Sequence, residues 1–469
     1  MKRFCYISFI LLFFFTNNLV SLEDLKSTDN QADYLCVYHP EFKESIQKFI
    51  EWRRLKGVNI VPIDVNEIYK EFGDSVSNVD AIRDFVSYAL EYWKEPEPGY
   101  LLLVGGINHI PAYKQRPWWW ADEKDSVTID DYYAINKYYV NENPHLPAIA
   151  IGRFPARNPK DLHIMIDKTI MFEDESEEID YKYDALVSAD REDYKLFEKY
   201  SNEIVELTLP RYLSIKRFDY REDSKYFGDK EDFINNINDG SVFLVNFFHG
   251  GEDVWMYNAL LTSNDVDILK FSSKPFLIAS MSCHQRWDDS LQKGIIEIFL
   301  CKNRSGAVAT IAPNGLNYAS MGFEFIRKIM REIFLSGVKE YGYAVLKAKQ
   351  YYKSELVARH TYLGDPMLRL PDRLFEPNAI TEYFKSMSFS NYPNPCDEYT
   401  NIVFTIPDNS YVELEVFDIL GNKIDILFSD YSYQGIQNIH WITSSLPSGI
   451  YICILKYGQN VLSKTIIVN

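Results

Sequence analysis

The sequence predicts an α/β protein with a mostly parallel sheet, followed by a smaller all-β sandwich. Two observations carry this prediction. Between residues 30 and 375, apolar strands alternate with helical segments, the pattern of a sheet covered by helices on both faces. From residue 388 onward, short strands follow one another between turn residues, which is typical of an antiparallel sandwich. The length of 469 residues is enough for two to four domains.

The chain opens with a targeting segment. Lys2 and Arg3 supply positive charge, and the apolar stretch from Phe4 to Phe15 has the length of a signal peptide but is too short to span a bilayer. We therefore expect residues 1–21 to be removed and the mature chain, without a transmembrane helix, to be exported.

The α/β region divides into an N-terminal sub-block over residues 30–180 and a second α/β sub-block over 181–375, in which the candidate catalytic residues described below lie. In both, strands of five to nine residues are expected to alternate with longer helices. The strands are expected at 33–38, 58–63, 99–104, 184–189, 241–248, 274–282 and 307–311, and the helices at 42–56, 79–93, 194–207, 323–335 and 341–353. The sandwich is expected over 388–469, with strands at 400–405, 411–417, 423–427, 435–441, 449–456 and 463–468.

Composition excludes some functions. The net charge of −18 repels phosphate backbones, so nucleic acid is not an expected partner. Six cysteines are present, and the first leaves with the signal peptide, so an odd number remains and at least one thiol is unpaired. Because no CxxC pair occurs, the sequence predicts neither a metal site nor a cofactor.

Two of the expected strands end in reactive residues. The strand at 241–248 leads into His249, and the strand at 274–282 leads into Cys283. Ligands bind beyond the carboxyl ends of parallel strands, and a separation of about 34 residues leaves room for one crossover. Both side chains are therefore expected at the functional edge of the sheet.

A thiol and an imidazole in that position can cleave an amide. A neighbouring base or cation converts the thiol of Cys283 to the nucleophilic thiolate, and His249 then protonates the leaving amine. The N–H groups of Gly250 and Cys283 could form an oxyanion hole. An ordinary strand-end histidine beside a buried structural thiol would give the same spacing, so the residues alone leave both interpretations open.

Seven ordered motifs between residues 33 and 372 resemble the gingipain-like cysteine peptidases, whose core has a caspase-like fold. The resemblance implies that His249 and Cys283 are the catalytic dyad. It departs at Phe248, where the family usually has glycine before the histidine. The motifs are Leu101–Gly106, Asp130–Tyr133, Ala150–Pro155, Asn246–Gly250, Ser280–Cys283, Gly306–Ala309 and Leu363–Pro366.

The same resemblance implies two roles for acidic residues. The family has a carboxylate that orients the catalytic histidine, and Asp190 occupies that place, although a helix N-cap would also suit it. Asp193 lies near the position where Arg-specific members carry a substrate-pocket carboxylate, which would favour Lys or Arg before the cleaved bond. His284, beside the nucleophile, is a second candidate base.

The tail resembles the C-terminal sorting domain of type IX secretion, an immunoglobulin-like sandwich. From the residues alone, a carbohydrate-binding module would give the same strand pattern. The resemblance implies passage across the outer membrane through the type IX machinery. The motifs are Tyr392–Pro395, Val416–Gly421, Leu446–Tyr451 and Lys464–Asn469.

Taken together, the sequence predicts a secreted cysteine endopeptidase that hydrolyses protein or peptide substrates through an acyl-enzyme intermediate. A sortase-like transpeptidase of the type IX secretion system would use the same dyad, but the chain's own sorting domain favours cargo over machinery. A non-catalytic surface-binding protein is disfavoured by the intact His249, Gly250 and Cys283.

Overall fold

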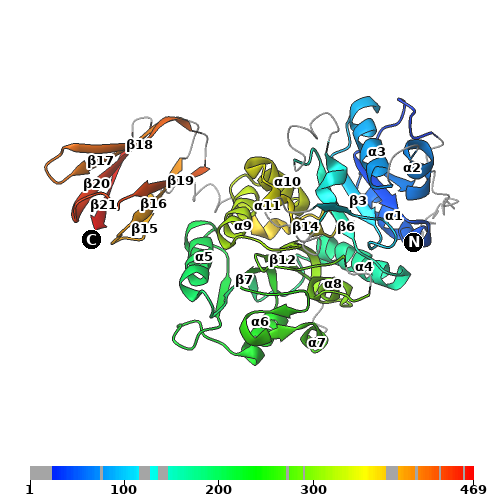
Figure 1. Cartoon of the computed structure of the whole chain (residues 1–469), viewed down its shortest axis with the longest axis horizontal. Helices are drawn as coiled ribbons and strands as arrows, with labels where there is room; N and C mark the ends of the chain where they lie inside the picture. Colours follow the sequence, from blue (N-terminus) through cyan, green and yellow to red (C-terminus); the bar gives the residue numbers. More distant parts are fainter. Residues whose placement is uncertain are drawn as a thin grey trace, which may run out of the picture.

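The computed structural model shows a large α/β core and a separate β-sandwich (Figure 1). The signal peptide expected at residues 1–21 lies outside the described residues. The structure describes residues 24–73, 78–115, 127–135, 146–270, 274–288, 291–375, 389–406, 410–432, 435–457 and 460–469.

Ten strands form the central sheet of the core, and every pairing but one is parallel. The fold class predicted from the sequence is thereby confirmed. In spatial order the strands are β2 (Ile60–Asp64), β1 (Tyr34–Tyr38), β3 (Tyr100–Val104), β6 (Ala150–Phe154), β14 (His360–Leu363), β13 (Ala307–Pro313), β12 (Phe276–Ser280), β9 (Ser241–Phe247), β7 (Tyr183–Ala189) and β8 (Ile215–Asp219).

The single antiparallel pairing, between β13 and β14, divides the sheet into two strand blocks. β2, β1, β3, β6 and β14 run in one direction and form the first block. β13, β12, β9, β7 and β8 run in the opposite direction and form the second block. The carboxyl ends of the two blocks therefore open at opposite edges of the sheet.

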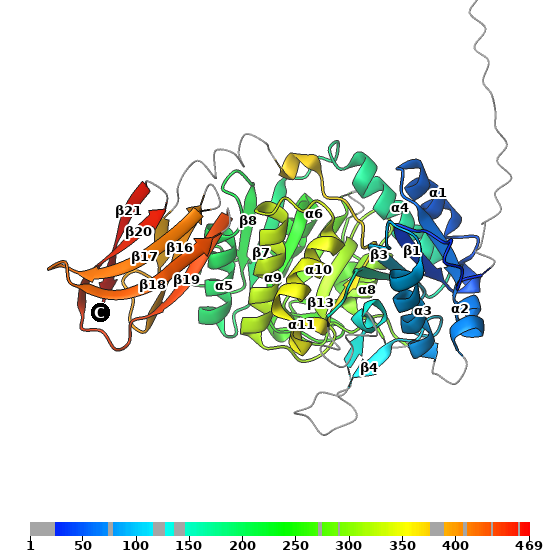
Figure 2. The same ribbon diagram turned by 90° about the horizontal axis from the view of Figure 1, so that it is seen from above.

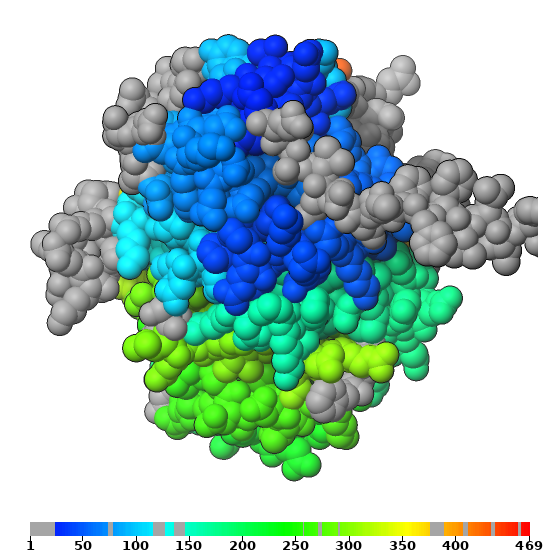
Figure 3. Space-filling view, turned by 90° about the vertical axis from the view of Figure 1, so that its right-hand side faces the viewer, coloured from blue at the N-terminus to red at the C-terminus, as the bar shows by residue number. Residues whose placement is uncertain are grey.

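Helices cover both faces of this sheet (Figure 2). Neighbouring residues of a strand point to opposite faces, so Leu244 belongs to the apolar cluster that includes α6 and α8, whereas Val245 belongs to the cluster that includes α5, α9 and α10. Figure 3 shows the end of the molecule at which residues of the N-terminal part of the core, in blue and cyan, gather above residues of the second block, in green. The helices are η1 (Pro40–Phe42), α1 (Gln47–Leu55), α2 (Val65–Phe72), α3 (Asn78–Tyr92), η3 (Asp130–Ala134), α4 (Pro159–Glu175), α5 (Tyr194–Leu207), α6 (Lys230–Asp239), η4 (Tyr257–Ala259), α7 (Ser263–Val266), α8 (Ile295–Cys301), α9 (Ala319–Phe334), α10 (Tyr341–Tyr352), α11 (Glu355–Ala358) and η5 (Asp372–Leu374).

A cluster of buried charged side chains joins the segment after β14 to β1 and α1. Asp365, two residues after β14, accepts a hydrogen bond of 2.7 Å from the Tyr34 hydroxyl of β1 and pairs with Arg53 of α1. Arg53 also pairs with Glu173 at 2.7 Å. These charges are nearly inaccessible to water, so losing one partner would leave an uncompensated buried charge.

The C-terminal strands form a two-layer antiparallel sandwich, as the sequence predicts. One sheet holds three strands and the other four, with an apolar core between them. The five cysteines of the described residues are free thiols. The first sheet contains β15 (Phe389–Tyr392), β16 (Tyr399–Ile406) and β19 (Gly435–Ile442), and the second contains β18 (Lys423–Ser432), β17 (Ser410–Asp418), β20 (Gly449–Tyr457) and β21 (Asn460–Val468). The remaining short strands are β4 (Tyr113–Gln115), β5 (Val127–Ile129), β10 (Val254–Trp255) and β11 (Leu261–Thr262), which form two small hairpin sheets in the core.

The sandwich lies beside α5 at the end of the second block (Figures 1 and 2). Lys199 of α5 hydrogen-bonds the hydroxyl of Tyr399 of β16, with its ammonium 4.5 Å from the ring centroid. A cavity of about 360 Å³ beside this contact is lined by residues of α5, α9, β16 and β19. Within the described part of the chain, no helix is long and apolar enough to cross a membrane.

Candidate active site

Cys283 and His249 follow two neighbouring strands of the second block. β9 and β12 are adjacent and parallel, and Asn246 pairs with Ser280 near their carboxyl ends. His249 and Cys283 each stand three residues beyond this pair. The structure therefore brings both residues to the same edge of the sheet.

The ring of His249 is held by a carboxylate and an aromatic side chain. Its Nε2 lies 3.0 Å from Oδ2 of Asp193, the residue that precedes α5. The ring packs edge-on against the buried Phe197, with 5.2 Å between ring centroids. Because the imidazole is 49% exposed and Asp193 is 65% exposed, substrate and solvent can reach this pair.

Asp190 contacts His249 differently from the sequence-based expectation. Its carboxylate is fully buried and accepts hydrogen bonds from the main-chain N–H groups of His249, at 3.2 Å, and Arg191, at 2.7 Å. Asp190 follows β7 directly, beside the end of β9, so its side chain meets the backbone of the neighbouring strand. The ring itself is contacted by Asp193, which the sequence had assigned to the substrate pocket.

The thiol of Cys283 is partly buried beneath a neighbouring loop. Its Sγ donates to the carbonyl oxygen of Asn317 at 3.6 Å, and burial raises the pKa of this thiol. The Asn317 side chain in turn lies 3.2 Å from Nε2 of His360, and burial lowers the pKa of His360 to about 3. The adjacent His284 has a φ of 52° and donates its N–H to Gly315.

Gly250 provides a main-chain N–H directly after His249. Gly250 lies opposite Trp255 in a short antiparallel bridge. The hydrogen bonds of this bridge run from the Gly251 N–H to Val254 and from the Met256 N–H to His249, so the bridge does not use the Gly250 N–H. A Cβ at this position would collide with the Ser282 hydroxyl and lie 2.9 Å from the Val254 oxygen. Only glycine fits here. Phe248, which stands where the family usually has glycine, packs in the core against Trp255.

Gln285 joins the loops that carry His249 and Cys283, and no expectation for this residue followed from the sequence. Its buried amide donates to the carbonyl of Gly251 at 2.7 Å and to that of Cys283 at 3.2 Å. The Trp255 indole donates to its amide oxygen at 2.5 Å. Its place two residues after Cys283 was the one available signal in the sequence, and it was too weak to identify the contact.

Comparison with known proteins adds two family matches. Residues 27–371 match the model described as Peptidase family C25, and residues 390–469 match the model described as Secretion system C-terminal sorting domain.

Individual relatives are more distant. A Lys-gingipain of Porphyromonas gingivalis is 24% identical over 299 residues, which are 61% of this chain but only 16% of that protein. The crystal structure of the Arg-specific cysteine proteinase gingipain R gives a TM-score of 0.55 at 16% identity, covering 94% of this chain and 99% of that chain. The complex of the RgpB pro- and mature domains of Porphyromonas gingivalis also gives 0.55 at 16% identity, covering 93% and 100%. These structural likenesses support the fold.

Proposed function

Because the chain belongs to peptidase family C25, we propose that it is an exported cysteine endopeptidase that hydrolyses peptide bonds through Cys283 and His249. The observation that carries the proposal is the arrival of both residues at one edge of the sheet from adjacent parallel strands. Membership of the family supports the cysteine peptidase class, and the cleavage of internal peptide bonds is the finer part of the proposal.

In the proposed mechanism, His249 takes the proton of the Cys283 thiol as substrate binds. Since Nε2 of His249 faces Asp193, Nδ1 is the nitrogen left to accept this proton. The sulfur attacks the carbonyl carbon, the negative oxygen is received by the N–H groups of Gly250 and Cys283, and His249 protonates the departing amine. Water then attacks the thioester, and the thiol is regenerated.

Asp193 and Asp190 act in this mechanism as positioning residues. Asp193 fixes the tautomer and orientation of the imidazole and stabilises the imidazolium that forms. Asp190 holds the main chain from which the ring projects. Asp193 has no role in substrate specificity in this mechanism, because its carboxylate contacts His249.

A mixed peptide library incubated with the mature protein tests the enzymatic proposal. We expect internal cleavage that is abolished by an alkylating agent, by Cys283→Ala and, nearly as fully, by His249→Ala. Adding an amine acceptor separates hydrolysis from peptide joining, since a transpeptidase would yield ligated products. Cleavage at the parental rate by Cys283→Ala would contradict the proposal.

The C-terminal sandwich is a sorting domain that directs the chain across the outer membrane to the cell surface or the medium. We propose that it is dispensable for catalysis, because the described residues of the dyad and its supports all belong to the core. Ending the chain near residue 378 is expected to give an active peptidase that stays in the periplasm. Fractionation and peptidase assays test both parts. An insoluble or inactive core would show that the sandwich is structurally required.

A further inference from the structure

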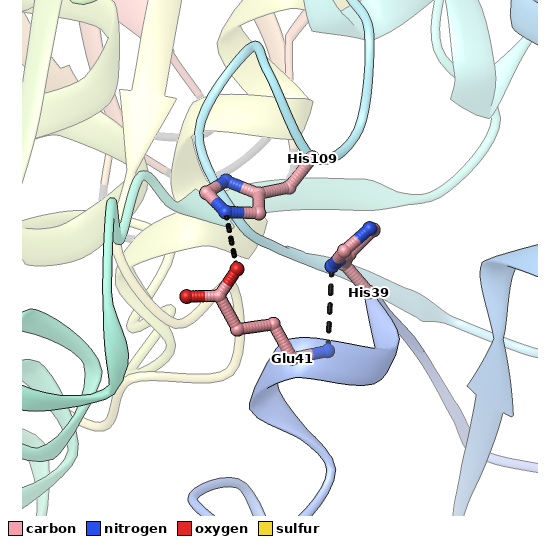
Figure 4. Close-up of side chains that lie close together, drawn as sticks. All are labelled: His39, Glu41 and His109. Carbon is pink, nitrogen blue, oxygen red and sulfur yellow. Dashed lines mark hydrogen bonds and ion pairs between the residues drawn. The ribbon is translucent and has the colours of Figure 1, made fainter.

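Three metal-ligating side chains meet at the other edge of the sheet, where the strands of the first block end (Figure 4). His39 follows β1 directly, Glu41 lies on η1, and His109 lies in the turn after β3. One donor atom from each residue lies within 4.8 Å of the other two. The dyad opens at the opposite edge, so this cluster is separate from the peptidase site.

The backbone brings the two histidines together. Tyr38 pairs with Val104 at the ends of β1 and β3, and the N–H of His39 donates to the Val104 carbonyl at 3.3 Å. Gly105 then turns the chain with a φ of +134°, and a Cβ there would lie 2.7 Å from the Cβ of His109. This turn folds the His109 side chain back over the strand end.

Below the cluster, the fully buried Phe42 forms an apolar floor, with its ring centroid 4.8 Å from that of His109. The two imidazole centroids are 5.0 Å apart. Nε2 of His109 lies 3.2 Å from the carboxylate of Glu41, while Nδ1 of His39 accepts a long bond of 3.3 Å from the Glu41 N–H. Burial, and to a smaller extent His109, lowers the pKa of His39.

We propose that His39, Glu41 and His109 bind a zinc ion or another divalent first-row transition metal. Two imidazoles and a carboxylate form a donor set suited to zinc, with a water molecule as the fourth ligand. Calcium and magnesium prefer sets made only of oxygen atoms. Metal–ligand distances of about 2.0–2.2 Å place tetrahedral donors about 3.4 Å apart. The donor atoms, which lie up to 4.8 Å apart, must therefore approach one another by as much as about 1.4 Å, and Glu41, whose side chain is 45% exposed, has freedom to move.

A metal at this position would clamp η1 to the turn after β3 and so stabilise the first block. It would take no part in peptide cleavage, because the dyad follows strands of the second block. The absence of a CxxC pair predicted no metal site from the sequence, because that pattern concerns paired cysteines only. His39 and Glu41 are separated by one residue, but His109 joins them only through the pairing of β1 with β3.

Calorimetric titration with zinc tests the proposal in the whole mature chain, carrying Cys283→Ala and no affinity tag. The substitution removes self-cleavage and a thiol that could itself bind zinc. We expect one zinc ion per chain. His39→Ala and His109→Ala should each weaken binding at least about 100-fold, since even outer-sphere partners of a metal are worth about 10–100-fold. Glu41→Gln should weaken it about 10-fold. His163→Ala, which removes an exposed histidine of α4, should leave affinity unchanged.

Circular dichroism in the presence of a chelator checks that each variant folds, and thermal unfolding checks the clamp. Zinc is expected to raise the midpoint of the parent and of His163→Ala, but not that of the histidine variants at the same concentration. If a histidine variant does not fold, Glu41→Gln decides, because its side chain is the most exposed of the three. No zinc binding by the parent, or equal affinity in the parent and Glu41→Gln, would overturn the site.

Discussion

The two carboxylates beside His249 should differ sharply in what they contribute. Asp193 contacts the ring from a position that is 65% exposed. An exposed ion pair is worth about 0.2–1 kcal/mol, which corresponds to a factor of about 1.4–5 in rate. We therefore expect Asp193→Asn to lower kcat about 2–5-fold, with KM and the free energy of unfolding almost unchanged. Water can partly replace the lost partner of the imidazole.

Asp190 is fully buried and accepts two main-chain hydrogen bonds, so its replacement should act through the fold. In Asp190→Asn, an NH₂ group replaces one carboxylate oxygen and cannot accept. A hydrogen bond to a charged group is worth about 1.5–3 kcal/mol. We expect a loss of about that size in the free energy of unfolding, and at least a tenfold loss of kcat/KM as the main chain of His249 moves.

Both variants can be measured with one fluorogenic peptide and by urea denaturation, with His249→Ala as the reference for complete loss of the base. The reasoning fails if Asp193→Asn is as inactive as His249→Ala. It fails equally if Asp190→Asn keeps both its parental stability and its parental rate, because the buried carboxylate would then have no structural role.

Three further predictions concern packing, protonation and buried charge. Gly250→Ala should lower kcat/KM at least about 100-fold, the cost of losing one oxyanion donor, because its Cβ collides with the neighbouring loop. Gly251→Ala, whose Cβ meets its nearest atom at 3.5 Å, should stay active, and equal activity of the two variants would contradict the packing argument. Burial raises the pKa of the Cys283 thiol, so alkylation of the free enzyme by iodoacetamide should be slow at neutral pH. The alkylation rate should reach its maximum at a higher pH than the rate for an ordinary cysteine. A rate already maximal at neutral pH would instead show a resting thiolate. Asp365→Ala should lower the free energy of unfolding by about 3–5 kcal/mol, as expected for breaking a buried ion pair, whereas Asp372→Ala, at a surface pair, should cost under about 1 kcal/mol in the same urea titration. Similar losses in both variants would refute the assignment of the buried cluster.

The sequence predicts those parts of the fold that local patterns determine. The apolar strands leading to His249 and Cys283 could be read directly, and parallel pairing then placed both residues at one edge. The reversal of direction at β14 could not be predicted, because a strand of four residues gives almost no periodic signal. It depends on contacts with strands far away in the chain.

The same limit applies within the site. Asp190 and Asp193 are both acidic and three residues apart, so residue type does not show that Asp193, at a left-handed backbone position, is the one that reaches the ring. Asn317 contacts the thiol from a loop 34 residues further along the chain. Neither role follows from residue type or spacing, since both depend on how loops fold back over a strand end.

The position of β14 also sets the order in which an exported chain can fold. The first block receives its fifth strand and the carboxylate of Asp365 from a segment that follows Tyr34 by 331 residues. As the chain emerges from its N-terminus, β6 presents an uncovered edge, a template on which other strands can add. The first block must therefore be kept from association while the whole second block is translocated. Its sheet is completed only when β14, at the end of the core and ahead of the sorting domain, has joined β6.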